Sequence, residues 1–363
     1  MIYICFLALF MGASFLDISI SKNKSTVALK KATMLYLFAI GVFFFGLRYY
    51  TGADWSGYIR YFENVDWNTT TYGFGFKTLN IVCKNFFGSY YVVQFLSTFI
   101  FLFSICYFFS RYTKYKFTCI FLAIALYFSL FIAQVRQSLA IAILLFGTDY
   151  LLSGKWARYV LIVILASLFH TTAIIMLCSF FLLIHISKMG RVFLCLVGFI
   201  LIKFPAVPIA AVSFASHFFP GKIGTIANTY LQSQIFNVGG EISSGLVFFS
   251  RQILMLVVFI FYKPKTKLDN FILNALTLYM ILLDCSLSFT MFSRVAHYFG
   301  FYAILGYSRF LDIHFLRYNK SIYSLAILLF LAFFFIPFAK SRLDSGINRI
   351  NGRPKQYVYI PYW

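Results

Sequence analysis

Long apolar segments follow one another along almost the whole chain, and short polar loops separate them. Because a helix needs about 20 mostly apolar residues to cross the hydrocarbon of a bilayer, such runs are typical of transmembrane helices. The runs are residues 2–18, 32–47, 90–109, 117–133, 137–152, 159–186, 192–219, 246–262, 271–291, 295–310 and 321–338. They predict an all-α, polytopic membrane bundle with about 10–12 transmembrane helices.

Two of the apolar runs are longer than one crossing, and each is predicted to break into two helices. The run over residues 159–186 carries a polar cluster at 169–172, which includes His170, near its middle. The run over residues 192–219 contains Pro205 and Pro208, and proline removes a backbone hydrogen bond from a helix.

Lysine and arginine gather in alternate loops, and this alternation sets the expected orientation. Cytoplasmic loops are enriched in these residues, so the basic loops are placed inside and the N-terminus, interpreted as a retained first span, outside. The basic loops are residues 21–31, 110–116, 153–158, 187–191, 263–270 and 309–320. We expect one transmembrane domain over 1–339 with long external loops near 48–89 and 220–245, followed by a basic, aromatic tail over 340–363. The alternation of loops places this tail outside, whereas its five lysines and arginines favour the inside, so its side stays open.

The composition excludes a soluble catalytic domain. Hydrophobic residues make up 61% of the 363 residues and charged residues 11%, against about 45–50% and 25% in ordinary globular chains. The formal net charge of +21 is dispersed over loops, which favours a topology signal facing anionic lipid over nucleic-acid binding. Seven scattered cysteines form no C-x-x-C pair, and no nucleotide-binding or zinc-hydrolase motif occurs, so no metal and no cofactor are expected.

Arginines recur at the external ends of the predicted helices, where the loop rule disfavours them. Guanidinium groups that converge there would bind a lipid diphosphate bidentately while staying charged. The alternative is that each is an interfacial anchor or pairs with a carboxylate in the same loop. The candidates are Arg48, Arg60, Arg136, Arg251 and Arg294, with His297 on the same helical face as Arg294.

The segment 46–58 leaves a membrane helix through glycines and aromatic residues, with Asp54 in the bend. Tyr49, Trp55 and Tyr58 are therefore candidate sugar contacts, and Asp54 is a candidate general base for an acceptor hydroxyl. The alternative is that these rings form an interfacial aromatic belt. His170 is a second candidate base, or a hydrogen-bonded core histidine.

Several short motifs in this order resemble the EpsG-like branch of the Wzy-type polymerases. They are residues 46–58, 75–80 (Gly-Phe-Lys-Thr-Leu-Asn), 135–142 (Val-Arg-Gln-Ser-Leu-Ala-Ile-Ala), 169–173 (Phe-His-Thr-Thr-Ala), 294–299 (Arg-Val-Ala-His-Tyr-Phe) and the closing 360–363 (Ile-Pro-Tyr-Trp). The chain departs from the family pattern at Gly73, where a glutamate is common, so no catalytic role is assigned there.

The resemblance implies an enzyme that joins oligosaccharide repeat units carried on undecaprenyl diphosphate, on the external face of the bacterial inner membrane. It also implies a helical fold like that of other lipid-sugar glycosyltransferases of the C type. Lipid-linked oligosaccharides, membrane lipids and a chain-length regulator are the expected partners. In this mechanism Arg48, Arg136 and Arg294 neutralise the leaving diphosphate, while Asp54 or His170 takes the proton from the acceptor.

Other functions remain open from the residues alone. The same arginines would suit a transporter (flippase) of lipid-linked oligosaccharide, and broken helices are typical of transporters. An O-antigen ligase or a membrane O-acyltransferase, with the buried histidine as base, is a further alternative.

Overall fold

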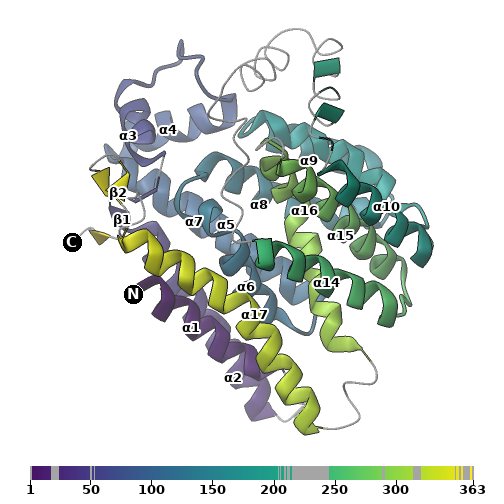
Figure 1. The fold of residues 1–363 in the computed structure, drawn as a ribbon. Helices are drawn as coiled ribbons and strands as arrows, with labels where there is room; N and C mark the ends of the chain where they lie inside the picture. Colours follow the sequence, from purple (N-terminus) through teal and green to yellow (C-terminus); the bar gives the residue numbers. More distant parts are fainter. Residues whose placement is uncertain are drawn as a thin grey trace. The chain divides into compact units, whose positions relative to one another are not determined.

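The computed structural model describes residues 2–17, 24–49, 51–52, 54–202, 204, 206–207, 210, 213–214, 245–287, 291–313, 320–347, 349–350, 353–354 and 360–361 (Figure 1). Residues 24, 245–250, 320–321 and those from 342 onward are described by their backbone alone. The predicted break at Pro205 and Pro208 lies outside these residues, and so does all but the last residue of the predicted external loop 220–245.

The chain forms two compact units. Unit 1 contains residues 1–177 and 324–363, and unit 2 contains residues 178–323. The elements up to the first boundary are α1 (Ile2–Ser14), η1 (Phe15–Asp17), α2 (Lys24–Gly46), β1 (Arg48–Tyr49), α3 (Trp55–Asn64), α4 (Phe74–Phe87), α5 (Tyr90–Tyr112), α6 (Lys116–Leu126), α7 (Phe128–Ile132), α8 (Val135–Leu152), α9 (Trp156–Ser167) and η2 (Thr171–Leu183). They continue with α10 (Lys188–Leu201), α14 (Gly245–Phe261), α15 (Lys267–Ser286), α16 (Met291–Ser308), η3 (Arg309–Asp312), α17 (Lys320–Ile347), β2 (Arg349–Ile350), β3 (Arg353–Pro354) and β4 (Ile360–Pro361).

The predicted all-α, polytopic membrane bundle is confirmed. Among the described residues, five helices are long and apolar enough to cross a membrane: Ser25–Gly46, Tyr90–Tyr112, Val135–Leu152, Lys267–Ser286 and Ile322–Ser341. Shorter apolar helices accompany them at Ile2–Asp17, Lys116–Leu126, Trp156–Ser167, Thr171–Leu183 and Arg251–Phe261. The strands are only two residues long and form two-stranded ladders.

The predicted interruption of the run 159–186 is confirmed, because α9 ends at Ser167 and a 3₁₀ helix, η2, begins at Thr171. The run 117–133, predicted as one helix, is also interrupted. Tyr127 has φ −121° and ψ 35°, so α6 ends at Leu126 and the short α7 follows. Tyr127 is buried, so the break lies in the packed interior of the unit.

The predicted external loop 48–89 is largely helical, since it contains α3 and α4. Buried aromatic residues of α3 alternate with exposed polar ones at helical spacing, which makes this helix amphipathic. Gly88 ends α4 in the left-handed conformation (φ +66°), which glycine adopts without a Cβ penalty. Ser89 then accepts a hydrogen bond from the Tyr91 N–H and caps α5.

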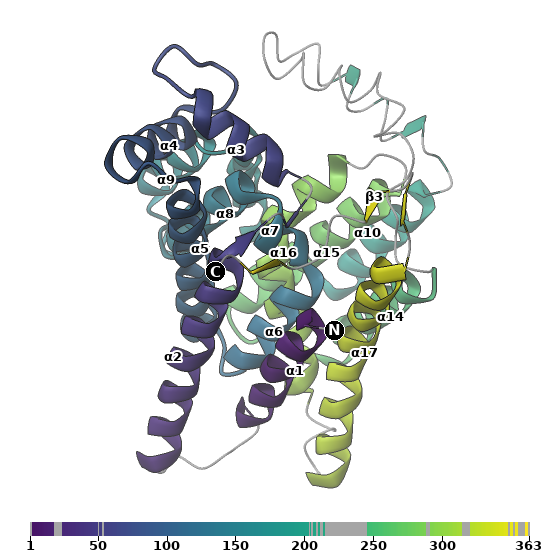
Figure 2. The ribbon, with the colours of Figure 1, turned by 90° about the vertical axis from the view of Figure 1, so that its left-hand side faces the viewer.

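In unit 1, α5 packs against α2, α4 and α8, and α8 packs against α9. Figures 1 and 2 both show α17, from the end of the chain, beside α1. The two ends of the unit also meet through β1 and β4, where Arg48 pairs with Pro361 and Tyr49 with Ile360. This pairing places part of the tail at the end of the unit where α2 leaves the bundle.

In unit 2, α15 packs against α10 and α16, and a buried polar network joins three segments. The Arg191 guanidinium donates hydrogen bonds to Asn274 Oδ1 and Asn270 Oδ1, both at 2.9 Å. The Asn274 amide donates to the Leu182 and Ile184 carbonyls at 2.9 and 2.7 Å. The network therefore provides acceptors for the N–H groups of a buried arginine and donors for the carbonyls at the end of η2.

Ion pairs join loop ends that the sequence places on one side of the membrane. Arg111, at the end of α5, binds Asp149, at the end of α8, at 2.7 Å in unit 1. Arg309 binds Asp269 at 3.1 Å in unit 2. These contacts agree with the predicted alternation of loops, and the side that faces outward stays a prediction.

Candidate functional site

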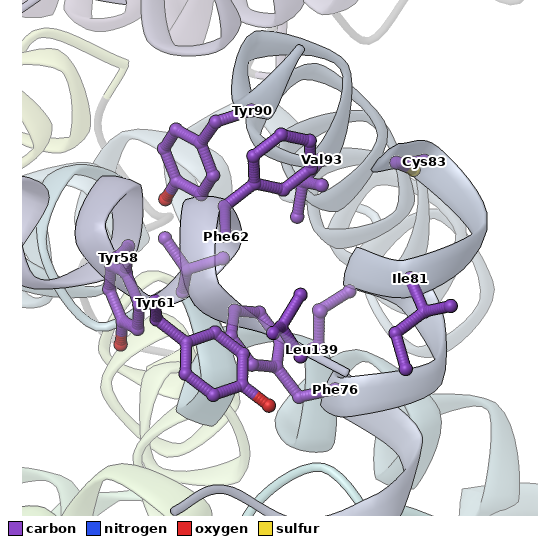
Figure 3. Close-up of a cluster of buried hydrophobic side chains, with 11 residues drawn as sticks. Tyr58, Tyr61, Phe62, Phe76, Ile81, Cys83, Tyr90, Val93 and Leu139 are labelled. Carbon is purple, nitrogen blue, oxygen red and sulfur yellow. The ribbon is translucent and has the colours of Figure 1, made fainter. Parts of the chain in front are cut away.

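An aromatic cluster in unit 1 brings together the predicted external segments. It joins α3, α4, the start of α5 and the start of α8, and Phe169, beside His170, packs against its edge. Figure 3 shows the cluster, with Tyr58, Tyr61, Phe76 and Tyr90 among its aromatic members. Its buried members are Tyr58, Tyr61, Phe62, Val65, Phe76, Ile81, Cys83, Tyr90, Val93, Val135 and Leu139.

Arg136 lies against this cluster, in the first turn of α8. Its guanidinium carbon is 3.9 Å from the centre of the Tyr72 ring and 6.0 Å from that of Tyr58, which are cation–π distances. The Arg136 Nε is buried and has no hydrogen-bond partner within the described residues. A buried N–H donor in this state has an unmet hydrogen-bonding capacity, which an acceptor that reached it would satisfy.

Three of the predicted site residues interact electrostatically with one pair of tyrosines. The rings of Tyr58 and Tyr90 stack with their centres 6.4 Å apart. Burial raises the pKa of the Tyr58 hydroxyl, while Arg136 lowers it by its charge and by a hydrogen bond, and Asp54 raises it. The charges of Arg48 and Asp54 both interact electrostatically with the Tyr90 hydroxyl. In unit 1, Arg48, Asp54 and Arg136 thus all interact electrostatically with this pair.

The turn that carries His170 is attached to the start of α4. The Gly75 N–H donates a hydrogen bond of 2.9 Å to the Leu168 carbonyl. A Cβ at Gly73 would lie 2.3 Å from that same oxygen, so the close approach requires glycine. The His170 Nδ1 and the Thr172 hydroxyl are 2.7 Å apart, and this contact orients the half-buried imidazole ring. His170 is therefore held at the edge of the aromatic cluster.

Arg48 and Arg60 differ sharply in their surroundings. Arg48 is 2% exposed, and its guanidinium donates to the Ile132 carbonyl at 3.2 Å and to the Phe45 carbonyl. It thereby caps the end of α7, a position where a cation is stabilised by the helix dipole. Arg60 is exposed on α3.

The predicted sugar-contacting residues form two groups. Tyr49 and Trp55 pack edge to face with ring centres 5.2 Å apart, and Tyr49 also approaches Tyr91 at 6.4 Å. Tyr49 is 37% exposed, whereas Trp55 is 9% exposed. Tyr58 belongs to the buried cluster beside Arg136. The exposed Tyr49 ring is the most accessible face for a sugar.

The other predicted phosphate-binding residues belong to unit 2. Arg251 stands on α14, its Nε is buried without a hydrogen-bond partner within the described residues, and its charge acts on Tyr307. Arg294 and His297 lie on the first turns of α16, and the Arg294 charge acts on His297. Convergence of these residues with Arg48, Arg60 and Arg136 stays a prediction.

Two residues of the site were missed from the sequence. Tyr72 and Tyr61 pack with ring centres 4.4 Å apart, and Tyr72 makes the shortest cation–π contact to Arg136. The amphipathic spacing of aromatic residues in 55–64 could have revealed Tyr61. Tyr72 follows a polar loop and carries no periodic signal. Among the described residues, no group of three or more His, Cys, Asp or Glu side chains is placed to hold a metal ion.

Comparison with known protein families gives a match over almost the whole length of the chain. A model of the EpsG family matches residues 31–348, a range that includes every predicted site residue. No curated protein and no solved structure matches the chain, so the expected likeness to C-type glycosyltransferases stays a prediction. Members of the EpsG family are Wzy-like polymerases. The chain belongs to the EpsG family, and this membership indicates a multi-pass membrane protein with a function of the polysaccharide-polymerase class.

Proposed function

We propose that the protein is a membrane glycosyltransferase that polymerises oligosaccharide repeat units carried on undecaprenyl diphosphate. The product is a surface polysaccharide, such as O-antigen, capsule or exopolysaccharide, and the reaction takes place on the external face of the bacterial inner membrane. Membership of the EpsG family supports the class of reaction. The apolar helices support a site at a lipid bilayer.

The environment of Arg136 is the observation that carries this proposal. Its position in the first turn of α8 adds the positive end of a helix to its own charge. Its buried Nε lacks a hydrogen-bond partner within the described part of the chain, and such a donor costs about 1–3 kcal/mol. A phosphate oxygen would remove this cost, and paired phosphates suit the two-pronged guanidinium.

The chemistry is a displacement at the anomeric carbon of the growing chain. A hydroxyl oxygen at the free end of a new lipid-linked unit forms a bond to that carbon, while the bond from the carbon to the diphosphate breaks. The electron pair leaves with undecaprenyl diphosphate, whose developing charge Arg136 stabilises. The acceptor proton passes to Asp54 or His170.

The remaining predicted residues have supporting roles in this proposal. Arg48, Arg60, Arg251, Arg294 and His297 contribute positive charge or hydrogen bonds to the diphosphate, and Tyr49, Trp55 and Tyr58 present aromatic faces to the sugars. The partners are lipid-linked oligosaccharides, membrane lipids and a chain-length regulator.

The test is to incubate the purified full chain in detergent with lipid-linked repeat units and to resolve the products by length. A ladder of products is expected. Unchanged single units, together with movement of the units across vesicle membranes, would instead identify a transporter. Transfer of a finished chain to another acceptor, or acylation at constant length, would identify a ligase or an acyltransferase.

A further inference from the structure

Tyr72 lies at the centre of the contacts around Arg136. Its ring centre is 4.4 Å from that of Tyr61, 5.7 Å from that of Phe76 and 6.0 Å from that of Tyr58. The Arg136 guanidinium carbon is closer to it than to any of these rings, at 3.9 Å. Tyr72 therefore links the aromatic packing of α3 and α4 to the cation at the start of α8.

The backbone on both sides of Tyr72 is held in place. On one side, Lys77 donates from Nζ to the Trp67 carbonyl at 2.9 Å, which ties the preceding loop to α4. On the other side, Gly73 lies so close to the Leu168 carbonyl that no Cβ fits. These two contacts restrain the loop that carries Tyr72 and so favour the position of its ring against Arg136.

The 3.9 Å cation–π contact with Tyr72 decides which part of the Arg136 guanidinium can meet a ligand. A guanidinium held against an aromatic face gives up that face, while its N–H groups stay free to make hydrogen bonds, one of which Arg136 makes to Tyr58. Two oxygens of a diphosphate can accept from these N–H groups only when the guanidinium plane has the correct orientation. A long arginine side chain without the ring would lose more rotamer freedom on binding.

We propose that Tyr72 is a positioning residue that holds the Arg136 guanidinium in the orientation needed to bind the diphosphate of the lipid carrier. This inference rests on the proposed role of Arg136 as the diphosphate ligand. Tyr72 touches the cation and acts on the substrate through it. The aromatic face of the residue, rather than its hydroxyl, performs this function.

The test measures the affinity of the purified full chain for undecaprenyl diphosphate in four proteins: the wild type, Tyr72→Leu, Arg136→Ala and the double variant. Tyr72→Leu is expected to weaken binding by up to about tenfold, because the freed arginine side chain then has to be ordered when the diphosphate binds. In the Arg136→Ala background the same change is expected to alter the affinity by less than about twofold, because no guanidinium remains to be oriented.

Two further variants separate positioning from general packing. Tyr72→Phe keeps the aromatic face and is expected to bind like the wild type. Phe62→Leu removes a different and more deeply buried ring of the same cluster, and is also expected to bind like the wild type. Thermal unfolding of each variant shows how much stability each has lost.

The proposal is overturned if Tyr72→Leu weakens binding equally in both backgrounds, or no more than Phe62→Leu does. Loss of affinity in Tyr72→Phe, or no measurable affinity in the wild type, would overturn it as well. The readout needs no turnover, so it is independent of the product ladder. A protein that binds the diphosphate as described but forms no polymer would contradict the proposed function and leave the role of Tyr72 supported.

Discussion

Gly73 offers a test of how the turn carrying His170 is joined to the rest of the site. Its backbone, with φ −60° and ψ 152°, is open to any residue, so Gly73→Ala introduces no backbone strain. The obstacle is the Leu168 carbonyl group, whose oxygen would lie 2.3 Å and whose carbon would lie 3.1 Å from the new Cβ. The substitution therefore pushes the start of α4 away from this turn.

The size of the effect follows from two contributions. Forcing an extra carbon into a packed position costs about 1–3 kcal/mol. The shift also stretches the 2.9 Å hydrogen bond from the Gly75 N–H to the Leu168 carbonyl, and a typical hydrogen bond contributes about 1 kcal/mol. Gly73→Ala is thus expected to weaken this attachment by about 2–4 kcal/mol.

Hydrogen exchange on the purified protein measures this loss at the Gly75 amide. A loss of 2–4 kcal/mol in opening free energy corresponds to exchange that is faster by roughly 30-fold or more. Gly57→Ala is the matched control, because a Cβ at Gly57, on α3, meets nothing within 4 Å. Exchange in Gly73→Ala that equals that of the wild type and of Gly57→Ala would refute the reasoning.

Two further predictions concern stability away from Arg136. Asn274→Ala should lower the Tm in detergent, because it removes one hydrogen bond from the buried Arg191 guanidinium. A hydrogen bond to a charged group contributes about 1.5–3 kcal/mol. An unchanged Tm would contradict the role assigned to this network. The Asp66 carboxylate accepts hydrogen bonds from Thr69, which lower the pKa of Asp66 below its ordinary value. The stabilisation of this turn is therefore complete above the ordinary pKa of an aspartate and is lost as the pH falls through the lowered pKa of Asp66. Limited proteolysis of the loop should accordingly become faster in acid for the wild type, and should not do so for Asp66→Asn.

The membrane helices and one of their breaks were predictable because they depend on local composition. Runs of about 20 apolar residues admit few structures in lipid, and the polar residues around His170 marked the interruption after Ser167. The break at Tyr127 was not predictable, since that residue and its neighbours are as apolar or aromatic as the rest of the run. The buried position of this break carries no signal in the local sequence.

The site was predictable only in part, because its contacts join distant segments. The arginines at the predicted external helix ends included Arg48 and Arg136. The charge of Arg48 interacts with Tyr90 and that of Arg136 with Tyr58, and these two rings stack on each other. Nothing in the sequence indicated that Arg48 would cap a carbonyl of Ile132, 84 residues away. The position of Tyr72 on Arg136 likewise depends on tertiary packing.

The rate of repeat-unit transfer by wild type and Arg136→Ala, measured as a function of donor concentration, tests the proposed role of Arg136 most directly. If Arg136 stabilises the leaving diphosphate in the transition state, Arg136→Ala should lower kcat by about 10²–10³-fold while the Tm stays close to that of the wild type. Polymer formed by Arg136→Ala at the wild-type rate and to full length would contradict that role.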